Sequence, residues 1–96
     1  MAFTFMLQFI VAEQHVEAFK EASIKLESHG KNAPGAIRFE YYQSKEDPTK
    51  FINFAIWESA ADSDRFAKSE AHVEIGGALP EGTILEFSST DLQALS

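Results

Sequence analysis

The sequence predicts an α+β sandwich whose elements follow the order βαββαβ. Four short segments rich in aromatic and β-branched residues predict strands. Two segments between them carry apolar residues at the spacing of three and four that is typical of an amphipathic helix. Turn residues separate the elements, so we expect the 96 residues to form one domain, residues 1–96.

The first strand and the first helix are predicted from a change of period. Apolar residues alternate from Thr4 to Val11, and the period becomes helical from about Glu13 to Ser28. The expected buried stripe of the helix contains His15, Phe19, Ala22 and Leu26. Gly30 is a residue that can adopt the left-handed conformation at a helix end, so we expect it to terminate the helix.

The next two strands are predicted to form an antiparallel hairpin. Ala36 to Ser44 is the first of these strands, and Phe51 to Trp57 is the second. The turn between them is Asp47-Pro48-Thr49-Lys50, in which proline presets the backbone and aspartate favours the first position. In the first strand one face is expected to carry Ile37, Phe39 and Tyr41.

A second helix is expected from about Ala60 to His72, with Ser59 as its N-cap. The residues predicted for its inner side are Ser63, Phe66, Ala67, Glu70 and Val73. Gly76-Gly77 ends this helix, and Thr83 to Ser89 is expected to form the last strand.

The strand from Phe51 to Trp57 is apolar on both faces. Residues two apart share a face of a strand, so one face carries Phe51, Asn53, Ala55 and Trp57. The other carries Ile52, Phe54 and Ile56. Two helices cover only one face of a four-stranded sheet, so we expect a second copy of the chain to cover the other and form a homodimer.

Composition excludes several classes of protein. A net charge of −7 argues against nucleic-acid binding, which needs a basic face. The chain has no cysteine, which removes disulfides and thiolate sites. No apolar run approaches the roughly 20 residues of a membrane span, and the first residues do not resemble a signal peptide. We therefore expect a cytoplasmic protein with no membrane partner.

The stretch PGAIRFEYYQSKEDPTKFINFAIWES resembles the core of the antibiotic biosynthesis monooxygenase family, and the later SEAH fits the same family. The resemblance extends from about Phe5 to Phe87. It implies a ferredoxin-like sandwich that forms a dimeric α/β barrel. Members of this family oxidise quinols or anthrones, degrade haem, or have no known reaction, so the resemblance is more specific for fold than for function.

The resemblance also points to individual residues. Asn53 and Trp57 match an Asn and a Trp that the anthrone-oxidising members place four residues apart on this strand. Ser63 stands where those members carry a tyrosine, and Phe66 stands where other members carry a histidine. The resemblance therefore implies cofactor-independent oxygenation of a small aromatic, quinol or anthrone-like compound, with these departures bearing on the substrate.

We interpret Asn53 and Trp57 as candidate catalytic residues that donate hydrogen bonds to a developing oxyanion. The alternative is that Asn53 bonds to neighbouring backbone and that Trp57 is a core residue. The residues expected to line a substrate pocket are Phe19, Tyr41, Phe66, His15 and His72.

Either His15 or His72 is a candidate general base. The alternatives are that His15 lies at the sheet–helix border and that His72 complements the dipole at a helix C-terminus. No histidine spacing suits a metal, so no metal is expected. The resemblance to members that oxygenate without a cofactor implies that no cofactor is needed. The alternative function is a homodimer that binds a small ligand without catalysis, or a haem-binding relative.

Overall fold

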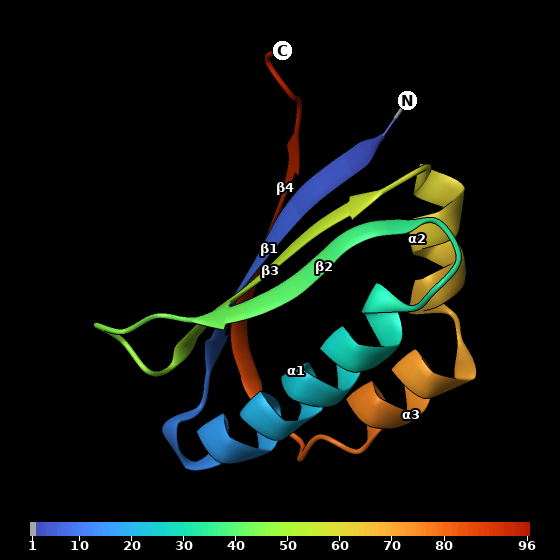
Figure 1. Cartoon of the computed structure of the whole chain (residues 1–96). Coiled ribbons are helices and arrows are strands. Elements are labelled where there is room, and N and C mark those ends of the chain that lie inside the picture. Colours follow the sequence, from blue (N-terminus) through green and yellow to red (C-terminus); the bar gives the residue numbers. More distant parts are fainter. Residues whose placement is uncertain (1) are drawn as a thin grey trace.

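The computed structural model describes residues 2–96 and has the expected βαββαβ order. The elements are β1 (Phe3–Val11), a short 3₁₀ turn η1 (Glu13–His15), α1 (Val16–Lys31), β2 (Ala36–Gln43), β3 (Lys50–Trp57), α2 (Ala60–Ala67), α3 (Glu70–Gly77) and β4 (Ile84–Leu92). The strands form one antiparallel sheet in the order β2-β3-β1-β4, and the helices lie on one side of it (Figure 1). This arrangement confirms the predicted ferredoxin-like α+β fold, with β3 and β1 in the centre.

Strand β3 separates the two faces of the sheet as its sequence predicts. Phe51, Asn53, Ala55 and Trp57 point toward the helices and are each no more than 2% exposed. The intervening residues Ile52, Phe54 and Ile56 are only half-buried, because no helix covers their side of the sheet. An apolar row therefore remains on the outer face of the sheet.

One prediction for β2 is wrong. Phe39 and Tyr41 face the helices, but Ile37 is 53% exposed instead of sharing their face. The register slips between Ala36 and Arg38, and the slip leaves Ile37 without a partner on β3. A bulge of this kind changes the face on which the flanking residues lie, and a period of two read from sequence does not reveal it.

Helix α1 continues to Lys31, beyond the predicted end at Ser28. Gly30 is helical and does not terminate it, since the described glycines with positive φ are Gly35 and Gly82. Gly30 instead permits a close approach, because a Cβ there would lie 2.3 Å from the Phe39 ring. No helix in residues 2–96 has the length and apolar character needed to cross a bilayer.

The predicted single helix from Ala60 to His72 is two helices. Helix α2 ends at Ala67, and Ser69 is the N-cap of α3 and accepts a hydrogen bond from the backbone N–H of His72 at 3.3 Å. Because the chain changes direction between α2 and α3, part of the inner side predicted for a single helix is wrong. Glu70 and Val73 are exposed, because they no longer continue the helical stripe of Phe66.

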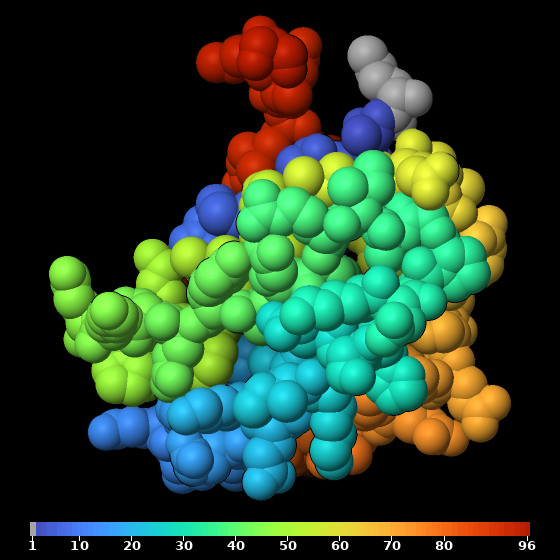
Figure 2. Space-filling view, viewed as in Figure 1, coloured from blue at the N-terminus to red at the C-terminus, as the bar shows by residue number. Residues whose placement is uncertain are grey.

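Strand β4 is longer than predicted and is not covered by the helices. It continues beyond Ser89 to Leu92, which pairs with Thr4. All of its residues are exposed, including Phe87 at 57%. The C-terminal residues and the turn between β2 and β3 project from the body of the molecule (Figure 2). The helices therefore cover the β2 side of the sheet more completely than the β4 side.

We predict that Gly30→Ala destabilises the protein by about 1–3 kcal/mol, because the added methyl group overlaps the Phe39 ring. The matched control is Gly76→Ala on α3, where an added Cβ has no atom within 4 Å. The control should gain up to about 1 kcal/mol, as expected when alanine replaces a helical glycine. Urea unfolding measures both. Equal effects of the two substitutions would contradict the close packing of α1 on β2.

Candidate functional site

A cavity of about 340 Å³ lies between the helices and the sheet. It is enclosed by side chains from all four strands and all three helices, and most of them are apolar. Its lining residues are Phe5, Leu7, Phe9, Phe19, Leu26, Phe39, Tyr41, Asn53, Trp57, Ser63, Phe66, Ala67, His72, Gly76, Leu79, Ile84 and Phe87. This volume lies near the lower end of the roughly 300–1,000 Å³ that is usual for small-molecule sites.

Trp57 is fixed in the wall of this cavity by aromatic neighbours. The centre of its ring lies 5.9 Å from that of Phe39 and 5.5 Å from that of Phe66. The side chain is 1% exposed, and its indole Nε1–H is a buried donor with no hydrogen-bond partner among the described residues. Leaving such a donor unpaired costs about 1–3 kcal/mol.

Asn53 lies on the same face of β3 as Trp57, four residues before it in the sequence. Its Nδ2 donates a hydrogen bond to the backbone carbonyl of Glu40 at 3.0 Å. This bond fixes the orientation of the amide, since the opposite orientation would place two carbonyl oxygens against each other. The second N–H of the same group is not needed for that bond. Asn53 therefore makes a contact with the backbone of β2 and also lines the cavity.

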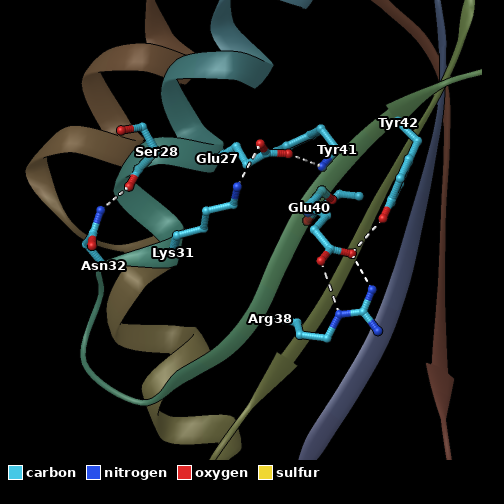
Figure 3. Close-up of polar contacts among 9 residues, drawn as sticks. Glu27, Ser28, Lys31, Asn32, Arg38, Glu40, Tyr41 and Tyr42 are labelled. Atoms are coloured by element: carbon cyan, nitrogen blue, oxygen red, sulfur yellow. Dashed lines mark hydrogen bonds and ion pairs between the residues drawn. The ribbon is translucent and has the colours of Figure 1, made fainter.

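Tyr41 brings a hydroxyl group from β2 to the cavity. The strand is attached to α1 at this point, because the backbone N–H of Tyr41 donates to Glu27 Oε2 at 2.8 Å (Figure 3). Burial raises the pKa of the Tyr41 phenol well above its usual value. The hydroxyl therefore remains protonated at neutral pH and can act as a hydrogen-bond donor.

His72 reaches the cavity from the first turn of α3. The break between the helices determines this position: the Ser69 hydroxyl donates to the Phe66 carbonyl at 2.6 Å and caps the helix that carries His72. The imidazole contacts the Phe66 ring edge to face, with 5.4 Å between ring centres. Burial lowers the pKa of His72 below 6.5, which favours the neutral imidazole. The alternative that His72 complements the dipole at a helix C-terminus is wrong, because it lies near the N-terminus of α3.

The structure places six of the seven predicted site residues around one cavity. These are Asn53, Trp57, Phe19, Tyr41, Phe66 and His72. The seventh, His15, ends the 3₁₀ turn before α1 and is not among the lining residues.

Sequence reasoning did not identify the contribution of β1 and β4 to the cavity. Leu7 pairs with Asn53, and Phe9 pairs with Phe87. The positions of these lining residues therefore depend on the register of β1 against β3 and β4. The alternation in β1 indicated which side chains share a face but not which strand lies beside them. Residues 2–96 contain no cluster of three or more His, Asp or Glu side chains arranged to hold a metal ion.

We predict that Asn53→Asp destabilises the protein more than Asn53→Ala at pH 7. The alanine variant loses one hydrogen bond, worth about 0.5–1.5 kcal/mol, whereas the aspartate places a buried carboxylate against the Glu40 carbonyl. Burial raises the pKa of such a carboxylate above its unfolded value, so stability is lost above that unfolded value and recovered as pH falls.

Urea unfolding of both variants and of the original chain at pH 5 and pH 7 measures this effect. The difference in the free energy of unfolding between Asn53→Asp and the original chain should be smaller at pH 5 than at pH 7. A difference that is independent of pH would show that Asn53 does not face the carbonyl oxygen.

The fold matches that of several solved structures. A structure from Nitrosomonas europaea has a TM-score of 0.89 and 22% identity, and the match covers 100% of both chains. One from Pseudomonas aeruginosa has a TM-score of 0.90 and 18% identity over 99% of this chain and 95% of that one. One from Methanosarcina mazei has a TM-score of 0.84 and 20% identity over 97% and 92%.

No curated protein matches the sequence. At these identities the structural matches establish the fold. The family follows from the sequence, because the model of the antibiotic biosynthesis monooxygenases matches residues 2–76, which include β1 to β3 and nearly all of the helical layer. The resemblance seen in the sequence is thereby confirmed: this chain belongs to the antibiotic biosynthesis monooxygenase family.

Proposed function

We propose that this protein is an oxygenase that acts on a small electron-rich aromatic compound, such as a quinol or an anthrone-like molecule, without a cofactor. The observation that carries the proposal is the unpaired Nε1–H of Trp57 in the wall of an apolar cavity. A buried donor of this kind is suited to an oxygen atom that gains negative charge during a reaction. We assign the second N–H of the Asn53 amide as another donor, because Asn53 lies on the same face of β3 and lines the same cavity.

The proposed reaction uses the substrate itself as the reductant. His72, kept neutral by burial, accepts a proton from the aromatic substrate. The resulting anion transfers one electron to O₂, and the two radicals combine to form a C–O bond. The protonated His72 returns its proton to the peroxide, which loses water to leave a carbonyl group. For a ring CH₂ the balance is CH₂ + O₂ → C=O + H₂O, with one oxygen atom in each product.

We predict that Trp57→Phe lowers the turnover rate by about 10²–10³-fold, the scale for loss of one donor to an oxyanion. The substitution retains most of the aromatic packing with Phe39 and Phe66 but removes the N–H. Asn53→Ala should lower the rate on the same scale. The measurement is O₂ consumption with a panel of quinols and anthrones, with and without added metal or flavin.

Folding stability provides the control for this experiment. The smaller ring leaves a space in a buried site, so Trp57→Phe should lower the free energy of unfolding by about 1–3 kcal/mol, and removal of the unpaired donor offsets part of that loss. The variant should therefore still be folded. Unchanged turnover in both variants would show that Trp57 and Asn53 serve only in packing, and it would contradict the proposed chemistry.

A binding protein of the same fold is the second candidate function. It is favoured by Ser63, which lines the cavity where the anthrone-oxidising relatives carry a tyrosine. A protein of this kind would bind the same aromatic compounds and consume no O₂ with any of them. The O₂ measurement, made beside a binding measurement, therefore separates the two functions.

We also propose that the protein is a homodimer formed through the outer face of the sheet. Ile52, Phe54 and Ile56 form an apolar row there that no helix covers. Polar groups of β2 border this row: Arg38 and the Tyr42 hydroxyl both contact the Glu40 carboxylate at 2.7 Å, and the Arg38 guanidinium lies 5.0 Å from the centre of the Phe54 ring (Figure 3). An apolar centre beside a polar rim is typical of a protein interface.

We predict that Phe54→Asp converts the dimer into monomer or aggregate, because it places a charge in the centre of this face. The matched control is Ile24→Asp on α1, where the isoleucine is already 63% exposed. Sedimentation velocity at micromolar concentration measures both variants. A monomeric original chain at that concentration would contradict the proposed interface.

A further inference from the structure

We propose that the cavity accepts only uncharged aromatic compounds and rejects those that carry a carboxylate, sulfonate or phosphate group. This inference deepens the proposed function and rests on it, because it concerns the ligand of the same cavity. It follows from three features: the chemistry of the lining, the carboxylates of a neighbouring hollow and the charge of the whole chain.

The lining contains polar groups but no full charge. Among the described residues that enclose the cavity there is no Lys, Arg, Asp or Glu, and His72 is kept neutral by burial. Trp57 and Tyr41 offer neutral donors to an oxygen atom of the ligand. An ionised group in such a site would lose its hydration without gaining a counter-charge, and that loss is far larger than one hydrogen bond returns.

A second hollow, about 510 Å³ in volume, adjoins the cavity between α2 and β4. It shares Phe5, Leu7 and Ser63 with the cavity, so the two lie side by side. Asp64 and Asp91 lie in its wall, and no Lys or Arg in the described chain lines it. Lys68 pairs with Asp64 at 3.3 Å, but both side chains are highly exposed and the pair is screened by water.

The net charge of the chain acts in the same direction. At −7 it lowers the local concentration of anions near the surface, and the carboxylates of Asp64 and Asp91 beside the cavity strengthen that effect. A neutral phenol has no charge to desolvate, and the negative surface does not repel it. It can place its ring among the phenylalanine side chains and its hydroxyl oxygen against the neutral donors. The structure therefore favours compounds whose polar groups are hydroxyl or carbonyl groups alone.

The test compares two probes that differ in one group, 1-naphthol and 1-hydroxy-2-naphthoate, by calorimetric titration at pH 7. We expect the carboxylate to bind at least about 100-fold more weakly, as the cost of burying an unpaired charge implies. Ile84 lines the cavity and is 43% exposed, so Ile84→Arg can add a cation without disrupting a packed core. This variant should strengthen binding of the carboxylate at least tenfold, and the control Ile84→Met should not.

The outcomes separate this inference from the function on which it rests. Equal affinity of the original chain for the two probes would overturn the inference and leave the cavity as a ligand site. Tighter binding of the carboxylate would do the same. Failure of both probes, and of the neutral quinols and anthrones, to bind would overturn the inference together with the proposed function.

Discussion

The burial of alternate residues of β3 beneath the helices is the constraint on which the rest of the structure depends. Phe51 and Ala55 supply apolar surface to the core, while Asn53 and Trp57 introduce polar groups at the same depth. Buried polar groups are stable where they find partners. Asn53 finds one in the Glu40 carbonyl, but the Trp57 indole finds none in the described chain. The strand that holds the fold together therefore also carries the one buried side-chain donor that is unpaired among residues 2–96, and this combination favours a ligand site.

The cavity exists because the helical layer is narrower than the sheet and is broken. Helix α1 packs closely on β2, where Gly30 leaves room for the Phe39 ring. On the other side β4 remains exposed, and the space between it and the helices is not filled. The break at Ser69 turns α3 and brings His72 into the wall, against Phe66. A continuous helix through Ser69 would have carried His72 along the direction of α2. The same break therefore ends one helix, caps the next and places a titratable group in the site.

The sequence allows prediction of the fold order, the central position of β3 and β1, and six of the residues that line the cavity. Periodicity and turn residues determine those features, and six of the seven predicted site residues lie together. Periodicity could not reveal the bulge that exposes Ile37, since a slip in register leaves no mark on composition. It also could not distinguish a helical Gly30 from a terminating one, because the reason for that glycine is a ring on another element. The extension of β4 to Leu92 was missed for a similar reason: its polar residues form a strand because β1 offers them a partner.

The central claim is that the indole N–H of Trp57 donates a hydrogen bond to an oxygen atom of the bound ligand. Trp57 is the only tryptophan, so a ¹H–¹⁵N spectrum contains a single indole signal that reports on this group. Titration with 1-naphthol, compared with titration by naphthalene, separates hydrogen bonding from ring contact. The account predicts that naphthol moves the indole proton signal downfield and that naphthalene, which has the same rings and no oxygen, does not. An indole signal that is unmoved by naphthol, or that moves equally with both compounds, would contradict it.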